Sequence, residues 1–346
     1  MPRPGGSSSG SGVWVEQPQA DAAEADGEKT HGEKTGGRSA WTRGRVLAAL
    51  SVVTAGLLAF HRAVPNAVGR LGSLLETFLP WLGLGVVVLL VLALLRRSAT
   101  ALVALLLPAA AWTYLFGGPL LPADGSGTRD LVAVQHNVSD ENADPAGTAR
   151  ALAGAGPDLI AMEELEPPAL PVYEKTLASG FPYHAVQGTV GLWSRYPLTG
   201  VLPLDIKPPE IADTWNRGLR AVAHTPHGQI AVYVAHLPSV RVRASGLASS
   251  WRDASAHRLG RAIAAEKVKA VILLGDLNGT VHDRGLSPLT SRMDEAERGL
   301  AFSFPVSFPL ARIDQVMARS ASVRHIRTLP ATGSDHLPVA ARITLD

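Results

Sequence analysis

The chain has 346 residues, room for about two domains, and its 32 Lys and Arg residues nearly balance 30 Asp and Glu residues. It contains no cysteine, which excludes disulfides and thiolate metal sites and leaves oxygen and nitrogen atoms as metal ligands. From Arg129 onward basic and acidic residues are equal in number. This part therefore lacks the basic excess that non-specific nucleic-acid binding requires.

The N-terminal third divides into a polar tail and an apolar region. Residues 1–40 are rich in Gly, Ser, Ala and charged residues, which predicts a disordered tail. Residues 41–121 hold three apolar segments, at about 46–63, 76–95 and 99–121. A membrane-spanning helix needs about 20 mostly apolar residues, so we predict three transmembrane helices, of which the first is short. A signal peptide in the first segment, or buried helices of a soluble protein, are the alternatives.

Basic residues at the segment ends predict the orientation in the membrane. They are frequent before the first segment, and Arg96 and Arg97 separate the second from the third. The positive-inside rule then predicts a multi-pass protein of the cell membrane with a cytoplasmic N-terminus and an extracellular C-terminal domain. If the first segment does not span, this orientation reverses. The short linker at 122–129 holds the following domain, 130–346, close to the lipid surface, which suits a substrate in the membrane.

The segment from Val271 to Asn278 is central to the C-terminal domain. Four aliphatic residues at 271–274 predict a strand buried on both faces, which then ends at Gly275 and Asp276. An ionised carboxylate at the end of a buried strand needs a counter-charge, such as a metal ion. Asp276 and Asn278 would point to the same side if the strand continued. An ordinary D-x-N-G turn is the alternative.

Polar residues recur where other predicted strands end. We expect strands at about 131–135, 159–162, 190–193, 230–235, 270–274 and 339–343, and helices at 145–155 and 255–267. Each polar residue alone has a structural explanation, but functional sites collect at the strand ends of a rigid sheet. The candidates are Asn137, Glu164, His236, Asp276, Asn278, Asp314, Asp335 and His336.

These residues lie in segments that resemble the endonuclease/exonuclease/phosphatase superfamily across residues 130–346. The segments are Asn137, Asp158–Glu164, Gly191–Pro197, His236-Leu237, Gly275–Asn278, Ile313-Asp314 and Ser334–Pro338. The resemblance implies an α/β four-layer sandwich, in which two packed, mainly antiparallel sheets are flanked by helices. It also implies a metal-dependent phosphatase or phosphodiesterase that uses Mg²⁺, with Mn²⁺ as the alternative.

The resemblance also implies which residues hold the metal. Glu164 is expected to be the main ligand, with Asn137 beside it and Asp314 completing the site or supporting it. The family often has Gln before its metal-binding Glu, whereas this chain has Glu163. This departure predicts a second acidic ligand or a different metal preference.

Five further residues are expected to act on the phosphoryl group. Asp276 would orient or deprotonate the attacking water, and Asn278 would hold a phosphate oxygen. His236 and His336 would contact the phosphoryl group and stabilise its charge. Asp335 would orient His336 through a hydrogen bond. Which residue acts as the general base stays open.

Apolar segments before such a domain resemble VanJ-type membrane-anchored proteins, which are associated with teicoplanin resistance. This implies hydrolysis of a lipid-linked, undecaprenyl-type diphosphate at the outer membrane face. The expected partners are the lipid bilayer and a lipid phosphate, and a nucleic-acid partner is not expected. The alternatives are a surface-tethered, Mg²⁺-dependent nuclease or phosphodiesterase and a catalytically inactive binding or scaffold protein.

Overall fold

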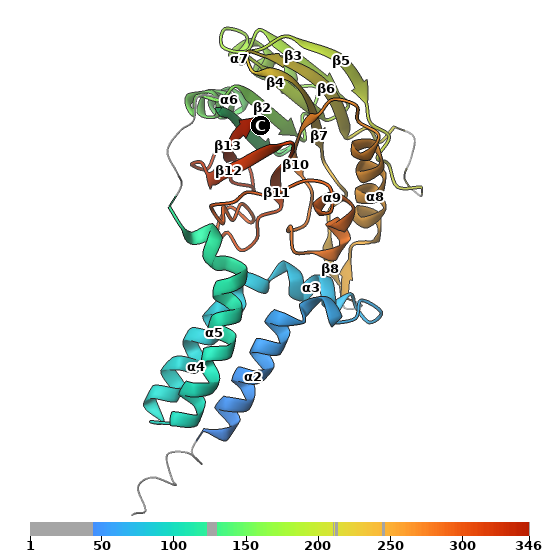
Figure 1. The fold of residues 1–346 in the computed structure, drawn as a ribbon. Coiled ribbons are helices and arrows are strands. Elements are labelled where there is room, and N and C mark those ends of the chain that lie inside the picture. The colour runs from blue at the N-terminus through green and yellow to red at the C-terminus, as the bar shows by residue number, and fades with distance from the viewer. Residues whose placement is uncertain (1–43, 123–129, 210, 212–213, 244–245, 346) are drawn as a thin grey trace, which may run out of the picture.

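A group of apolar helices leads into a two-sheet domain (Figure 1). The computed structural model describes residues 44–122, 130–209, 211, 214–243 and 246–345. The predicted tail at 1–40 and nearly all of the predicted linker at 122–129 lie outside the described residues.

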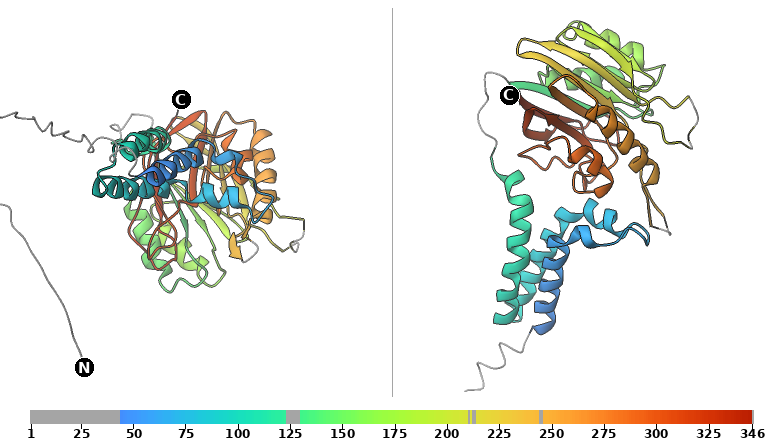
Figure 2. Two further views of the ribbon diagram at one scale, coloured as in Figure 1. Left: turned by 90° about the horizontal axis from the view of Figure 1, so that it is seen from below. Right: turned by 45° about the vertical axis from the view of Figure 1, so that its right-hand side comes forward.

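The helical region contains four α-helices and two 3₁₀ turns. The helices are α2 (Arg45–Ala59), α3 (Leu71–Thr77), α4 (Leu82–Leu95) and α5 (Ala99–Leu120), and the turns are η1 (His61–Ala63) and η2 (Leu79–Trp81). Ser98 caps α5 by accepting a hydrogen bond from the Ala101 N–H. Helices α2, α4 and α5 lie side by side, whereas α3 lies across their upper end, beneath the sheets (Figures 1 and 2).

The prediction of three transmembrane helices is not supported. Within the described residues, α5 is the one helix long and apolar enough to cross a membrane. A second spanning segment results only if the helices Leu71–Thr77 and Leu79–Leu95, whose axes are bent by 66° relative to one another, count as one span. The bend falls where Pro80 removes a backbone donor, so the segment predicted at 76–95 is not one straight helix. Helix α2 has 15 residues and is too short by the same measure.

Two mixed sheets form the rest of the chain. The first has the strand order β12-β13-β1-β2-β4-β3 and the second β11-β10-β7-β6-β5. All neighbours are antiparallel except β1 with β2 and β7 with β10, so the predicted antiparallel character holds with one parallel pair in each sheet. The bounds in the first sheet are β1 (Asp130–Asn137), β2 (Leu159–Glu163), β3 (Tyr183–Gln187), β4 (Val190–Ser194), β12 (Ala321–Thr328) and β13 (Val339–Leu345). Those in the second are β5 (Leu198–Pro203), β6 (Gly218–Thr225), β7 (Gly228–Ala235), β10 (Ala270–Asp276) and β11 (Asp314–Arg319).

The sheets pack face to face and helices cover their outer faces. The central apolar cluster takes residues from both sheets, for example Leu192 and Val232. Helices α6 (Pro145–Gly154) and α7 (Leu170–Leu177) pack on the first sheet, and α8 (Ser250–Ala264) and α9 (Ser287–Thr290) on the second. This arrangement is the predicted α/β sandwich. A turn, η3 (Arg284–Leu286), precedes α9, and a hairpin of β8 (Arg241–Arg243) and β9 (Gly246–Ala248) precedes α8.

Several elements differ from the sequence prediction. The helix predicted at 255–267 begins at Ser250 and ends at Ala264. Strand β5 was not predicted, because its residues are exposed or half-buried and therefore show no apolar alternation. The strands β3, β6 and β12 and the helix α7 were also not predicted.

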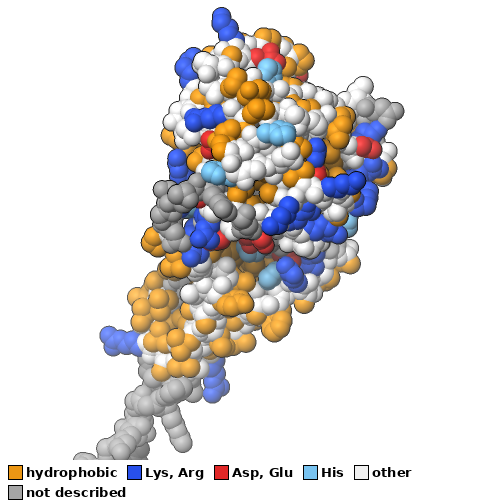
Figure 3. Space-filling model, turned by 45° about the horizontal axis from the view of Figure 1, so that its top comes forward, with side chains coloured by type: hydrophobic (Ala, Val, Ile, Leu, Met, Phe, Trp, Pro, Cys, Tyr) orange, Lys and Arg blue, Asp and Glu red, His pale blue; other side chains and the backbone are white. Residues whose placement is uncertain are grey.

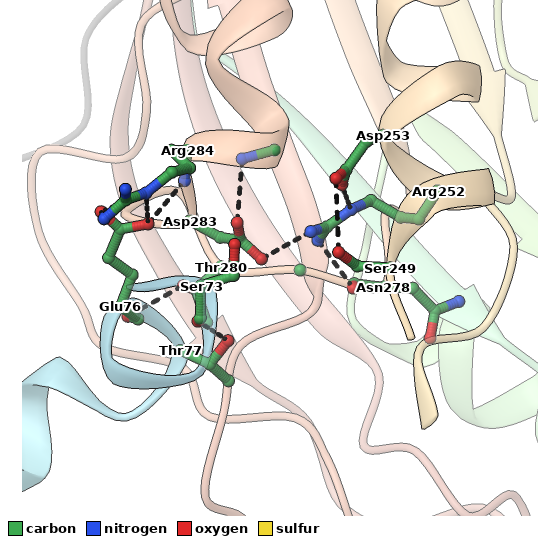
Figure 4. Close-up of polar contacts among 12 residues, drawn as sticks. Ser73, Glu76, Thr77, Ser249, Arg252, Asp253, Asn278, Thr280, Asp283 and Arg284 are labelled. Atoms are coloured by element: carbon green, nitrogen blue, oxygen red, sulfur yellow. Dashed lines mark hydrogen bonds and ion pairs between the residues drawn. The ribbon is translucent and has the colours of Figure 1, made fainter. Parts of the chain in front are cut away.

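Backbone hydrogen bonds join the helical region to the sheets. The Leu247 N–H donates to Gly69 O at 2.9 Å, and the Gly299 N–H donates to Pro119 O at 2.8 Å. The Trp81 indole N–H donates to Leu310 O at 2.7 Å. These bonds and the side-chain contacts in Figure 4 hold the sheets over α3 and the end of α5.

Candidate active site

Four strands bring their carboxyl ends to one edge of the sandwich. Asn137 ends β1, Glu163 ends β2, His236 follows β7 and Asp276 ends β10. β1 and β2 are parallel, as are β7 and β10, so the ends within each pair coincide. Asp314 begins the antiparallel strand β11 opposite Asp276. The predicted strand-end residues therefore meet in the fold.

Asp276 is the centre of a hydrogen-bonded group. Asn137 Nδ2 donates to Asp276 Oδ2 at 3.2 Å, and the Asn278 N–H donates to Asp276 Oδ1 at 2.9 Å. Asn278 Nδ2 donates to Leu237 O at 2.9 Å. The expected reason for the proximity of Asp276 and Asn278 is wrong: the strand ends at Asp276, and Asn278 has φ +48°. A turn closed by the Asp276 carboxylate brings them together.

Asp314 and His336 form a buried pair. His336 Nδ1 lies 2.8 Å from Asp314 Oδ2, and Gln135 Nε2 donates to Asp314 Oδ1 at 3.1 Å. Burial disfavours the charged imidazole, but the charges of Asp314 and Asp276 outweigh it and raise the pKa of His336 to about 10. Despite burial, His336 and its hydrogen bond lower the pKa of Asp314.

The prediction that Asp335 orients His336 through a hydrogen bond is wrong. The Asp335 side chain is exposed, and the bond to the imidazole comes from Asp314 instead. Residues 333–336 form a bend in which Asp335 is exposed while His336 is buried. The hydroxyl of Ser334 accepts from the His336 N–H at 3.0 Å and donates to Asn137 O at 2.7 Å, which fixes the segment.

His236 lies between the acidic residues and an arginine that the sequence did not predict. Its Nε2 is 3.7 Å from Asp276 Oδ2 and 3.8 Å from Glu164 Oε1. Arg217 Nη1 lies 3.2 Å from His236 Nδ1. Burial and the Arg217 charge lower the pKa of His236 to about 3, so this imidazole is neutral at pH 7. Arg217 directly precedes β6, and predicting that strand would have drawn attention to it.

The acidic pair Glu163 and Glu164 is divided between two environments. Glu163 is fully buried and accepts a hydrogen bond from Gln135 Nε2 at 2.7 Å. Glu164 has φ +60° and a side chain 27% exposed, and it faces His236. Burial and the charges of Asp314 and Asp276 raise the pKa of Glu163 well above its usual range. Gln135 is a second functional candidate that the sequence did not predict.

The model of the endonuclease/exonuclease/phosphatase family matches residues 134–336, more than half of the chain. This chain belongs to that family. Members of the endonuclease/exonuclease/phosphatase family are hydrolases that act on phosphodiester bonds, so hydrolysis is the class of chemistry expected at this site.

Solved structures are similar in fold at low sequence identity. An endonuclease/exonuclease/phosphatase from Beutenbergia cavernae is 19% identical, with a TM-score of 0.50 over 63% of this chain and 72% of that one. A family member from Bacteroides thetaiotaomicron is 16% identical, with a TM-score of 0.51 over 63% and 95%. Humanized TDP2 of D. rerio is 18% identical, with a TM-score of 0.51 over 63% and 100%. No curated protein matches this chain in sequence.

The site fits a divalent cation, which family members typically use. Asp276, Asp314 and His336 each offer a ligand atom within 4.8 Å of the others. Among the described residues, Glu163 Oε1 is buried without a hydrogen-bond partner. Burial and the nearby Asp314 raise the pKa of Asp276 to about 7, although His336 opposes this. A bound cation would supply a positive counter-charge to these buried carboxylates.

The donor atoms also indicate which kind of cation fits. Asn137, Glu163, Glu164 and Asp276 offer oxygen atoms, which Mg²⁺ and Mn²⁺ accept. When bound, such a cation polarises phosphate oxygens and neutralises charge that develops on them. While His336 is protonated its ring nitrogens cannot bind a metal, so it would add a positive charge to the site and leave the carboxylate and amide oxygens as ligands. The neutral His236 can accept a proton or donate a hydrogen bond, depending on its tautomer.

Proposed function

We propose that this protein is a membrane-anchored, metal-dependent phosphoesterase that hydrolyses a lipid-linked diphosphate of the undecaprenyl type. The observation that carries the proposal is that one structure contains both a cluster of buried carboxylates and a set of exposed apolar helices. A cluster of buried strand-end carboxylates, in which Glu163 Oε1 has no hydrogen-bond partner, lies in a domain that is hydrogen-bonded to exposed apolar helices.

The apolar helices support a membrane anchor. Their exposed side chains include Val46 at 72%, Leu84 at 59%, Leu95 at 75% and Leu106 at 67%. Such a surface is costly in water and suits hydrocarbon. On the face shown in Figure 3, hydrophobic side chains cover much of the helical region, while charged side chains gather on the domain above it.

The residues around the phosphoryl position support hydrolysis. His336 is held protonated by Asp314, and Arg217 adds a second positive charge beside His236. These groups would stabilise the charge on a phosphoryl group under attack by water. Asp276 is the carboxylate best placed to orient that water, since Asn137 and Asn278 hold both of its oxygens.

We further propose that the anchor is embedded in the cell membrane with the domain on the extracellular side. Arg96 and Arg97 precede α5, so if α5 crosses the membrane with this basic end on the cytoplasmic side, the domain that follows it lies outside. The basic residues preceding α2 lie on the same side as Arg96 and Arg97 in this arrangement. Removal of the terminal phosphate from a diphosphate-bearing lipid carrier of the cell wall at that face would connect the enzyme to glycopeptide resistance. The cation in this proposal is Mg²⁺, with Mn²⁺ as the substitute.

The test is phosphate release from undecaprenyl diphosphate by the full-length chain in detergent, with Mg²⁺ and with EDTA. Plasmid nicking is measured in the same buffer. Asp276→Asn should lower phosphate release at least 100-fold, because the altered side chain cannot act as a carboxylate. Asp205→Asn, at an exposed position, is the matched control and should retain activity.

The outcomes separate the candidate functions. Metal-dependent phosphate release with intact plasmid supports the lipid phosphatase. Nicked plasmid without phosphate release identifies a nuclease, and inactivity in both assays identifies a binding protein. Full activity of Asp276→Asn would contradict the assignment of the active site.

A further inference from the structure

A cavity of about 620 Å³ lies beside the active site but outside the residues described above, apart from Arg217. Its walls come from the segment before β6, the loop after β7, the hairpin β8–β9 and the start of α8. Trp215, Arg217, Pro238, Arg241 and Trp251 line it. The volume falls in the range of small-molecule sites, roughly 300–1,000 Å³.

Arg217 connects this cavity to the catalytic residues. Its guanidinium lies 3.2 Å from His236 Nδ1 and 5.5 Å from the centre of the Trp215 ring. Pro238 lines the cavity two residues after His236. A molecule whose phosphoryl group reaches His236 would therefore place its next group against Arg217.

The charge of the cavity indicates an anion. Among the described residues, no carboxylate forms an ion pair with Arg217 or Arg241, whereas Arg220, Arg252 and Arg284 are each paired with one. Two arginines without an acidic partner beside a phosphoryl site match a second phosphate. The half-buried Trp215 and the Trp251 side chain, 47% exposed, add an aromatic surface.

The cavity wall rests on the segment that leads into the apolar helices. Leu247 of β9 donates its N–H to Gly69 O at 2.9 Å, and Arg70 is paired with Asp253 of α8. Trp251 lies two residues before Asp253, so it is close to this junction. Tryptophan is enriched where protein meets the boundary between water and lipid.

We infer that this cavity binds the lipid-side phosphate of a diphosphate, through Arg217 and Arg241, with the adjoining hydrocarbon against Trp251. This inference rests on the proposed function and specifies its substrate. Water attacks the terminal phosphorus, and a new P–O bond forms as the bond to the bridging oxygen breaks. The electron pair stays on the bridging oxygen of the lipid monophosphate, beside the two arginines, and the second product is inorganic phosphate.

The test compares two substrates of the full-length protein in detergent with Mg²⁺. Farnesyl diphosphate carries the second phosphate and a hydrocarbon chain, whereas bis(p-nitrophenyl) phosphate carries neither. Arg241→Ala should lower the ratio of kcat/KM between these substrates about tenfold, the effect of losing one charge-assisted hydrogen bond. Arg261→Ala, which removes the same charge from an exposed position of α8, is the control and should leave the ratio unchanged.

A second variant addresses the hydrocarbon. Trp251→Ala should raise KM for farnesyl diphosphate more than for inorganic diphosphate, which has no chain. An unchanged substrate ratio in Arg241→Ala, with active wild-type enzyme, would overturn the inference and leave the proposed function intact. Wild-type enzyme that hydrolyses neither substrate would overturn both. Preference for an oligonucleotide over farnesyl diphosphate would reject a lipid in the cavity.

Discussion

Glu76 of α3 and the half-buried Arg284 of η3 form an ion pair that joins the helical region to the two-sheet domain (Figure 4). Arg284 Nη2 donates to Glu76 Oε1 at 2.8 Å, Nε lies 3.0 Å from Oε2, and the Arg284 N–H donates to Oε2 at 2.9 Å. The Glu76 side chain is fully buried. The same guanidinium donates to His61 O and Val64 O. One side chain of the domain therefore binds three points of the helical region.

The first prediction concerns this pair. Arg284→Ala should lower the free energy of unfolding by about 3–5 kcal/mol, because it leaves the fully buried Glu76 charge without its partner. Glu76→Ala should lower it by less, because the remaining Arg284 side chain is 26% exposed. The double variant should lose less free energy of unfolding than the two single variants lose together, with a coupling energy of roughly 2 kcal/mol. Thermal and denaturant unfolding in detergent measures this. The exposed pair Arg258 and Asp205 is the control and should couple by less than about 1 kcal/mol.

The second prediction concerns Arg252, which links this junction to the active site. Its Nη2 donates to Asp283 at 2.6 Å, next to Arg284, and its Nη1 donates to Asn278 O at 3.1 Å. Arg252→Lys keeps the charge but lacks the planar fork that reaches both partners. We expect kcat to fall about tenfold and KM to change little, because a displaced Asn278 would disturb the alignment of the reacting groups rather than the affinity for substrate. Arg258→Lys on the same helix should have no effect, and a raised KM with normal kcat would contradict a positioning role.

The third prediction concerns metal binding and pH. Saturating Mg²⁺ should stabilise the protein by about 2.7 kcal/mol at 100 times its Kd, and EDTA should remove this gain. Asp276 has a pKa of about 7, and Glu163 has a raised pKa, through burial and the neighbouring acidic charges. Asp276 is therefore partly protonated near pH 7 without metal, and the raised pKa of Glu163 acts in the same direction, so a cation must displace protons when it binds.

The sign of the pH effect follows from this competition. The Mg²⁺-induced rise in Tm should be larger at pH 8 than at pH 6, since fewer protons then compete. Glu163→Gln cannot become a carboxylate and should show a smaller rise with weaker pH dependence. An equal rise in wild type and Glu163→Gln at both pH values would exclude Glu163 from the metal site.

The fourth prediction concerns acid stability at Glu266, which is far from the active site. Arg220 donates to both of its carboxylate oxygens, at 2.9 and 3.0 Å, and Tyr233 donates at 2.9 Å. Burial raises the pKa of Glu266, but these hydrogen bonds and the Arg220 charge outweigh it and lower the pKa to about 2. A depressed carboxyl pKa stabilises the fold above the unfolded value of 4.5 and loses that contribution as the pH falls toward 2.

Glu266→Gln should therefore destabilise the protein by about 2 kcal/mol at pH 7, after allowance for screening by solvent. The difference in Tm between wild type and variant should shrink between pH 4.5 and pH 2. A difference that stays constant across this range would show that packing, rather than charge, is responsible. Glu174→Gln, at a side chain 39% exposed, is the control for loss of a carboxylate.

The sequence alone determined the fold class and most of the site. Runs such as Val271–Leu274 are apolar at every position, and a strand buried on both faces removes all of them from water. The polar residue that ends each run then falls at the sheet edge by chain connectivity. This is why Asn137, His236 and Asp276 could be predicted together without a structure.

Tertiary structure decided which of these groups are partners. The pairing of His336 with Asp314 rather than Asp335 depends on the register of β11 beside β10, which no local pattern encodes. Arg217 reaches His236 because β6 pairs with β7. The ion pair of Glu76 with Arg284 joins residues 208 positions apart. Local sequence specifies burial and strand ends through hydrophobicity, whereas contacts between distant charged groups depend on how the completed layers pack.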